Sequence, residues 1–157
     1  MKIEDLTRQA FQPFGDVVEM PDAAHYTINQ GFAERFDNLA NIDVAMEGGA
    51  AKVSLFDVRP RPTPIQINLM ERHPLGSQLF YPLQNENWLV LVCADPHDAK
   101  SYRCFRASGQ QGINYARSTW HFPLLVFAPS KFIVIDRKGP GHNLDEVMLA
   151  QALSLGI

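Results

Sequence analysis

The sequence predicts an all-β protein. Its apolar runs are short, rich in Val, Ile, Phe and Trp, and interrupted by Pro and Gly, which is typical of a β-sandwich or β-barrel. The alternation of strands with long helices that indicates a parallel sheet is not visible. A chain of 157 residues is long enough for one domain that buries roughly two-thirds of its unfolded surface.

At least five segments have the residue types of β-strands. Residues 53–59 and 65–72 flank a proline-rich segment, which cannot donate the hydrogen bonds of a sheet. Three further segments are apolar on both faces, as in buried strands, and the last two of them end at turn residues. These are residues 88–93, 124–127 and 132–135.

Helix is expected only near the two ends of the chain. Residues 4–11 are long enough for one or two helical turns, and residues 145–153 fit a C-terminal helix with Asn143 as its N-cap. Residues 31–49 match neither a helix nor a strand. The prediction is therefore one β-domain over residues 1–157 with short N- and C-terminal helices.

The composition excludes several classes of protein. The chain has 14 basic and 17 acidic residues, and no run of like charges could follow a phosphate backbone or an anionic membrane. No segment approaches the roughly 20 apolar residues of a membrane span, and the N-terminus lacks the core of a secretory signal. We therefore expect a soluble, cytoplasmic protein without a nucleic-acid or membrane partner. Cys93 and Cys104 lack metal-site spacing and are expected to be buried and reduced.

A cluster of functional side chains follows the strand predicted at residues 65–72, in the segment ERHPLGSQ at residues 71–78. Strand alternation places Glu71 and His73 on the inward, apolar face, whereas Arg72 should point away. A buried acid and imidazole need a ligand, a metal or each other to offset their desolvation. The cluster predicts either the rim of an active site or a satisfied ion pair at a strand end.

A second cluster lies in the segment GINYARSTWHFP at residues 112–123. If this segment is a strand, Tyr115, Arg117 and His121 share one face, and His121 faces His73. Two such clusters predict one pocket. The alternatives are a turn position for Asn114, a surface charge for Arg117, and core packing for Tyr115.

The spacing of these residues resembles the cupin barrel, in which one motif carries HxH followed by Glu and a second motif carries a further His. Glu71-x-His73-(x)4-Gln78 has this spacing, with Glu71 replacing the first His and Gln78 replacing the Glu. His121 falls where the second motif places its histidine. The resemblance implies a cupin-like double-stranded β-helix barrel. It also implies a metal site at Glu71, His73, Gln78 and His121, suited to a divalent ion such as Ni²⁺, Mn²⁺ or Fe²⁺.

Longer blocks resemble the ureidoglycolate lyase family. They are FGDVV at 14–18, NQG at 29–31, ERHPLGSQ at 71–78, GINYARSTWHFPL at 112–124 and IDR at 135–137. The chain departs from the family pattern at Phe122, where a second histidine is expected, and at Asp57, where an arginine is expected. The resemblance implies a homodimeric cupin that cleaves (S)-ureidoglycolate into glyoxylate and urea, a late step of allantoin and purine degradation.

The chemistry of this substrate suggests roles for the charged residues. Breaking the C–N bond needs a base for the hydroxyl proton, an acid for the departing urea nitrogen and a cation for the carboxylate. His73 and His121 are the candidates for base and acid, in either order, with Glu71 as their partner. Arg117 or Arg72 would bind the carboxylate through two parallel hydrogen bonds, and strand parity favours Arg117.

The remaining polar residues of the two clusters would recognise the ureido group. Asn114, Gln78 and Ser77 offer amide and hydroxyl hydrogen bonds, and Tyr115 either donates to the developing carbonyl or packs. Three other functions use the same groups. A cupin oxygenase or isomerase normally has a fuller histidine set, and a non-catalytic metabolite-binding cupin needs no acid and base. A ureidoglycolate hydrolase would release ammonia and carbon dioxide in place of urea.

Overall fold

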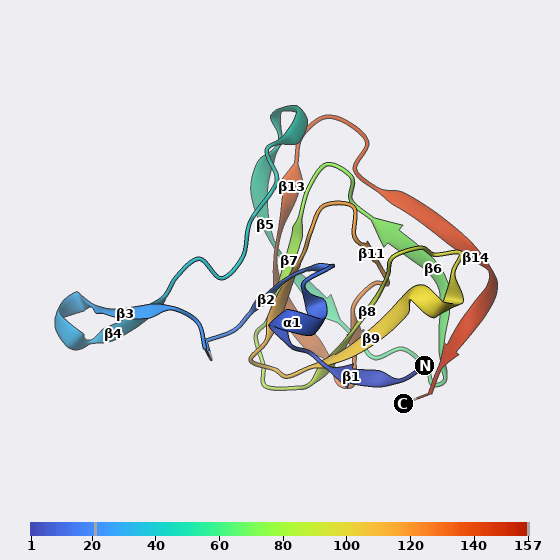
Figure 1. Cartoon of the computed structure of the whole chain (residues 1–157), viewed down its shortest axis with the longest axis horizontal. Helices are drawn as coiled ribbons and strands as arrows, with labels where there is room; N and C mark the ends of the chain where they lie inside the picture. Colours follow the sequence, from blue (N-terminus) through green and yellow to red (C-terminus); the bar gives the residue numbers. More distant parts are fainter. Residues whose placement is uncertain (21, 157) are drawn as a thin grey trace.

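Two curved β-sheets and a projecting hairpin make up the computed structural model, which describes residues 1–20 and 22–156 (Figure 1). The larger sheet has the strand order β1-β9-β8-β11-β6-β14, with β12 beside β8. All its pairings are antiparallel except that of β1 with β9. Its strands are β1 Ile3–Asp5, β6 Ile65–Arg72, β8 Trp88–Cys93, β9 Tyr102–Ala107, β11 Trp120–His121, β12 Leu125–Val126 and β14 Asp145–Leu155.

The smaller sheet has five strands in the antiparallel order β2-β10-β7-β13-β5, and the hairpin is formed by β3 and β4. The bounds of these strands are β2 Gly15–Val18, β5 Ala50–Val58, β7 Gln78–Pro82, β10 Gly112–Tyr115, β13 Ser130–Lys138, β3 His25–Ile28 and β4 Ala33–Phe36. The helices are the α-helix α1 Arg8–Phe11 and the short 3₁₀ helices η1 Asn29–Gly31, η2 Met46–Gly48 and η3 Ala99–Ser101.

The apolar composition of β8 is explained by a core on each of its faces. Trp88, Val90 and Val92 pack between the two sheets, against residues of β7, β10 and β13. The alternate residues of β8 pack into a second core that β6 and β14 help to enclose. A strand that is buried on both faces reads as a continuous apolar run. All six of its residues are buried.

The prediction of a mostly β protein is confirmed, and each of the five predicted strands overlaps an observed one. At the N-terminus, residues 3–5 pair with β9, so the helix is confined to four residues, with Thr7 as its N-cap. Phe11 at the end of α1 is fully buried, which anchors this segment to the body.

The predicted C-terminal helix is wrong, because residues 145–155 form the long strand β14. Glu146, Met148 and Leu149 have high helix propensity, but β6 offers a full edge of backbone donors and acceptors. The register between β14 and β6 shifts between Met148 and Leu153, which lets Leu153 and Leu155 reach the second core. Tertiary pairing therefore overrides local propensity.

Both cysteines are free and buried, as predicted. Burial raises the pKa of the Cys93 thiol to about 12 and that of the Cys104 thiol to about 11, so both remain protonated near neutral pH. Among the residues that the structure describes, no helix is long and apolar enough to span a membrane.

Candidate active site

A cavity of about 570 Å³ opens between the two sheets and gathers residues from both sequence clusters. β6 supplies Glu71, β7 supplies Gln78, and β10 and β11 supply Tyr115 and His121. The end of β5 and the proline-rich segment after it complete the wall. The prediction that the two clusters meet at one pocket is therefore confirmed for these residues.

Strand pairing places His121 directly beside Glu71. The two residues are opposite each other where β11 pairs with β6, and His121 Nε2 lies 3.4 Å from Glu71 Oε1. The ring of Tyr115 stacks on His121 with centroids 4.2 Å apart and an interplanar angle of 17°. Because only 2% of His121 is exposed, its imidazole is held in a fixed orientation.

His73 lies beside His121, one residue beyond the end of β6. The two ring centroids are 5.3 Å apart, so the predicted proximity of the two histidines is confirmed. Gly76 gives the ERHPLGSQ segment its close packing, because a Cβ there would lie 2.7 Å from the Cβ of Arg137. Asn143 also holds this segment by accepting a hydrogen bond from the Leu75 amide.

Backbone carbonyls fix the tautomer of both histidines. Nδ1 of His73 lies 2.8 Å from the carbonyl oxygen of Asn143, and Nδ1 of His121 lies 2.9 Å from that of Thr119. A carbonyl oxygen can only accept, so each Nδ1 carries a proton. In the neutral rings, each Nε2 therefore presents a lone pair.

These lone pairs lack hydrogen-bond partners. Nε2 of His73, Nε2 of His121 and Oε1 of Gln78 are all buried without a donor. The contact from Nε2 of His121 to Glu71 brings two acceptors together, which is unfavourable unless a cation lies between them. Such a cation is either a proton on His121 or a metal ion.

The donor set fits a divalent metal. Ligand atoms of Glu71, His73 and His121 all lie within 4.8 Å of one another. Histidine ligands of a metal typically donate their other ring nitrogen to a carbonyl or carboxylate, as both histidines do here. Imidazole and carboxylate together suit first-row transition ions.

Electrostatics keep Glu71 ionised and Tyr115 neutral. Burial is the largest single influence on Glu71 and opposes its ionisation, but His121, His73 and Arg61 together outweigh it and hold the pKa of the carboxyl below its usual value. Burial, and then the charge of Glu71, raise the pKa of the Tyr115 phenol far above its usual range. Glu71 therefore acts as an acceptor or ligand, and Tyr115 as a neutral donor.

Arg117, Asn114 and Ser77 line a different cavity, of about 280 Å³. Arg117 lies 3.6 Å from the carboxylate of Asp43 and also contacts Met46, and Asn114 donates to Asp16. The predicted shared face of Arg117 and His121 is wrong. Residues 116–119 form a turn with Ser118 at a φ of 67°, so strand alternation does not continue from β10 to β11.

Arg72 points away from the cavity, as alternation predicts. Its Nε donates to Asp145 at 2.8 Å, and its guanidinium lies 4.5 Å from the ring centroid of Trp120. Asp145 is directly opposite Arg72 in the pairing of β6 with β14. The structure therefore gives Arg72 a partner in the sheet and does not bring it to the histidines.

The sequence reasoning missed Arg59 and Arg61, which line the cavity with Glu71 and His121. The guanidinium of Arg61 lies 4.7 Å from the ring centroid of Phe122. In the sequence, both arginines lie in the proline-rich segment that joins β5 to β6, close to the ERHPLGSQ block, and this position was the feature that could have identified them as site residues. Phe122 and Asp57, the two departures from the family pattern, line the same wall.

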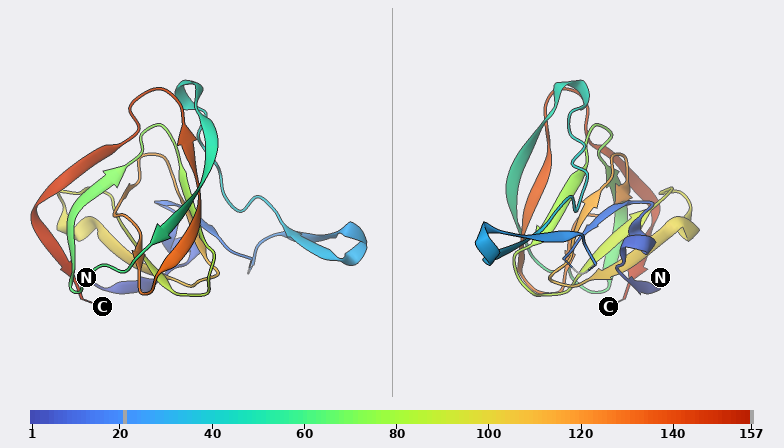
Figure 2. Two further views of the ribbon diagram at one scale, coloured as in Figure 1. Left: turned by 180° about the vertical axis from the view of Figure 1, so that it is seen from behind. Right: turned by 60° about the vertical axis from the view of Figure 1, so that its left-hand side comes forward.

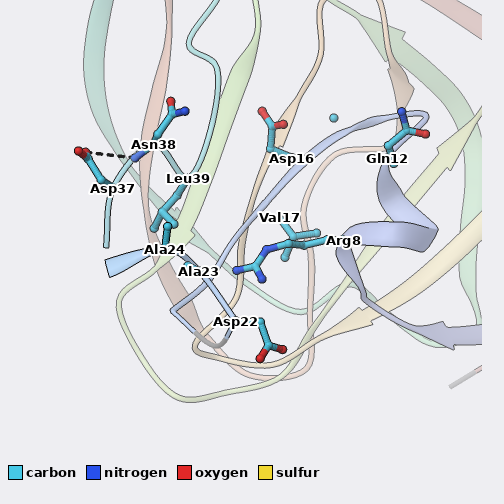
Figure 3. A pocket seen from close by; sticks show the side chains of 11 residues that line it. Arg8, Gln12, Asp16, Val17, Asp22, Ala23, Ala24, Asp37, Asn38 and Leu39 are labelled. Atoms are coloured by element: carbon cyan, nitrogen blue, oxygen red, sulfur yellow. Dashed lines mark hydrogen bonds between the residues drawn. The ribbon is translucent and has the colours of Figure 1, made fainter. Parts of the chain in front are cut away.

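A second large cavity, of about 440 Å³, lies at the base of the hairpin (Figure 3). Its side chains include Arg8, Asp16, Asp22 and Asp37, and Arg8 donates to the carbonyl oxygen of Glu19. The residues described around this cavity include no histidine and no cysteine. The cavity between the sheets, by contrast, is lined by the imidazole of His121 together with the carboxylate of Glu71.

Known proteins resemble this chain over nearly its whole length. The sequence model of the family described as ureidoglycolate lyase matches residues 1–156. Ureidoglycolate lyase 1 of Rhizobium meliloti (strain 1021) is 50% identical over 148 residues, which are 93% of this chain and 87% of the relative. Ureidoglycolate lyase of Burkholderia mallei (strain NCTC 10229) is 49% identical over 157 residues, which are 99% and 92%.

Among solved structures, an oxalate decarboxylase from Bacillus subtilis aligns with a TM-score of 0.40 and 14% identity. The alignment covers 69% of this chain and 27% of that one. The sequence matches are far stronger than this structural likeness, and they span both histidine-containing segments. The chain therefore belongs to the ureidoglycolate lyase family.

Proposed function

We propose that this protein is a ureidoglycolate lyase, a carbon–nitrogen lyase that cleaves (S)-ureidoglycolate into glyoxylate and urea in allantoin degradation. The observation that carries the proposal is the convergence of ligand atoms of Glu71, His73 and His121 within 4.8 Å of one another, in a chain that matches this family over residues 1–156. The proposal includes one cupin-like double-stranded β-helix domain over residues 1–157. It also places the enzyme in the cytoplasm, with a small molecule rather than nucleic acid or membrane as its ligand.

The two histidines are placed to move the protons of the reaction. One Nε2 takes the proton of the substrate hydroxyl, whose oxygen forms the carbonyl of glyoxylate as the C–N bond breaks. The electron pair of that bond goes to the ureido nitrogen, and the other histidine donates a proton there to release urea. Protons and electrons balance, because one proton is taken and one is given. The ring centroids of His73 and His121 are 5.3 Å apart, so one imidazole can reach the hydroxyl and the other the ureido nitrogen of the same substrate molecule.

As an alternative to proton transfer by the two imidazoles, Glu71, His73, His121 and Gln78 would hold a divalent cation, since each ring has one free nitrogen, Nε2, which can serve only one of the two roles. A divalent cation held there would lower the pKa of the substrate hydroxyl and stabilise negative charge on its oxygen. Glu71 balances positive charge on either His121 or the metal, and its lowered pKa keeps it a carboxylate. The phenol of Tyr115, stacked on His121, holds that imidazole in place.

Arg61 is the best-placed cation for the substrate carboxylate. Arg117 and Arg72 each have an acidic partner outside the cavity, whereas Arg61 lies over Phe122 on the cavity wall. The aromatic ring at position 122 supports a guanidinium by a cation–π contact. A planar guanidinium can then meet the carboxylate with two parallel hydrogen bonds.

Replacing Arg61 by alanine is expected to raise KM for ureidoglycolate by about 10- to 100-fold with a smaller change in kcat, because a charged hydrogen-bonded contact is lost in ground and transition states alike. Arg61→Lys should recover part of this loss. Steady-state kinetics provide the measurement, and Arg106→Ala, an exposed arginine on β9, is the matched control. An unchanged KM in Arg61→Ala would exclude this role.

The activity is tested by adding racemic ureidoglycolate to the purified protein and measuring glyoxylate, urea and ammonia separately against uncatalysed decay. The lyase produces glyoxylate and urea in equal amounts, and consumption stops at half of the racemate if only the (S) form is used. Ammonia in place of urea would show a hydrolase. No acceleration over uncatalysed decay would refute both reactions and favour a metabolite-binding protein.

A further inference from the structure

Asp136 is an acidic residue on the inner face of the five-stranded sheet. Along β13, Phe132 and Val134 point into the core between the sheets, and strand alternation gives Asp136 the same direction. β5 (teal) lies beside β13 (orange) in both views of Figure 2, and its Lys52 is directly opposite Asp136. Asp136 belongs to the IDR segment at residues 135–137, to which the active site described above gives no role.

Across the sheet, Asp136 is the neighbour of a residue that lines the active-site cavity. The register of β13 with β7, extended by one residue beyond its last pair, places Asp136 opposite Gln78. Gln78 lines the cavity and pairs in turn with Tyr115 on β10, whose ring stacks on His121. Adjacent strands are about 4.8 Å apart, and directly opposite residues on one face are in reach of each other. This row of side chains therefore leads from the imidazole of His121 to the carboxylate of Asp136.

Two oxygen atoms in this row are buried without a hydrogen-bond donor. They are Oδ1 of Asp136 and Oε1 of Gln78. Nζ of Lys52 lies 3.6 Å from Asp136 Oδ1, which is longer than a hydrogen bond, and the Lys52 side chain is 46% exposed. An ion pair of this kind contributes little free energy. Because a buried acceptor without a donor is costly, the two oxygens require a ligand that donates to them.

The chemistry of these oxygens defines the end of the ligand that they can bind. Two neighbouring acceptors suit an amino group with two N–H donors, whereas Asp136 repels a carboxylate. The ureido end of the proposed substrate offers such an amino group. The carboxylate of the same substrate is attracted to Arg61, which follows the end of β5, whereas Lys52 lies near the start of that strand.

We propose that Asp136 is a substrate-binding residue that accepts a hydrogen bond from the terminal amino group of the ureido substrate. This inference rests on the proposed function, since it names the residue that recognises one end of that substrate. Asp136 lies outside the group of candidate metal ligands formed by Glu71, His73 and His121, so its role is the same with a metal or a proton there. A site built to bind an N–H group rejects an analogue that lacks it, because the buried acceptor is then left unpaired. Asp136 therefore selects a ureide over a simple amide.

The selectivity is tested by kinetics with ureidoglycolate and with 2-acetamido-2-hydroxyacetate, in which a methyl group replaces the terminal amino group. Cleavage of either compound releases glyoxylate, so one assay serves for both. For the wild type, kcat/KM of the analogue should be lower by about 100-fold. Asp136→Ala should lose about 100-fold on ureidoglycolate and less than about threefold on the analogue. Asp136→Asn keeps an oxygen at this position and should recover part of the loss.

Lys52→Met is the matched control, because it removes the ion pair and leaves the carboxylate in place. It should keep the wild-type preference for ureidoglycolate. A thermal melt identifies any variant that fails to fold. A folded Asp136→Ala variant that loses nothing, or that loses equally on both compounds, would overturn the proposal. So would a Lys52→Met variant with the same loss of preference, since the ion pair would then be the feature that matters.

Binding of two unreactive compounds tests the site without turnover. N-carbamoylglycine has the ureido group but no hydroxyl, and N-acetylglycine has a methyl group in place of the amino group. In calorimetric titrations the wild type should bind N-carbamoylglycine at least about 10-fold more tightly, and Asp136→Ala should bind the two alike. Equal affinities in the wild type would overturn the proposal. A wild type that makes this distinction but cleaves no ureidoglycolate would refute the proposed reaction and leave the binding site standing.

Discussion

His121→Ala is expected to lower kcat/KM for ureidoglycolate by at least about 10³-fold, because the change removes a proton-transfer group from the reacting centre. The same residue is a candidate metal ligand and contacts Glu71 and Tyr115. His73→Ala should have a similar effect, since its buried Nε2 also lacks a hydrogen-bond partner and its ring lies in the same cluster as Glu71 and His121. The measurement is steady-state kinetics of glyoxylate formation.

Two controls separate loss of chemistry from loss of fold. His121→Asn keeps a polar side chain against Tyr115 and should fold like the wild type, which a thermal melt would show, yet remain inactive. His97→Ala removes an exposed histidine outside the cavity and should retain wild-type rates. Wild-type rates in both His121→Ala and His73→Ala would mean that neither histidine moves a proton.

The sequence predicted that Glu71 and His73 point inward; His121 does lie beside His73, although the alternation used to place it does not continue through residues 116–119. Acidic and imidazole side chains at the ends of apolar strands are costly to bury, so their presence there marks a site that compensates the cost. The apolar runs also located β8 and β13, because strands with a core on one or both faces leave a clear pattern.

The arginines could not be placed from the sequence, because alternation holds only while a strand continues. The turn at residues 116–119 redirects Arg117 toward Asp43, and nothing in the residue pattern marks Ser118 as left-handed. Arg61 lies in a segment without regular structure, so its contact with Phe122 follows from the meeting of two distant segments. β14 was missed for a related reason, since its pairing with β6 comes from tertiary structure.

Removal of the metal is the second change that is expected to have a large effect on activity. The wild type should bind about one equivalent of Ni²⁺ or Mn²⁺ per chain. Dialysis against a chelator should abolish glyoxylate formation, and adding the ion back should restore it. Elemental analysis and calorimetric titration provide the measurements. Bound metal should also stabilise the fold, by about 2.7 kcal/mol when the free ion is at about 100 times its Kd.

Glu71→Gln distinguishes a metal from a proton as the cation between Glu71 and His121. If a metal is bound there, loss of the carboxylate should weaken metal affinity by about 100-fold or more, whereas Glu86→Gln, an exposed control, should not change it. Metal affinity should also fall as pH decreases, because protons compete for the Nε2 lone pairs. If instead the wild type binds no metal and keeps full activity in chelator, the cation is the proton on His121. The histidine pair then performs the cleavage with Glu71 as its counter-ion.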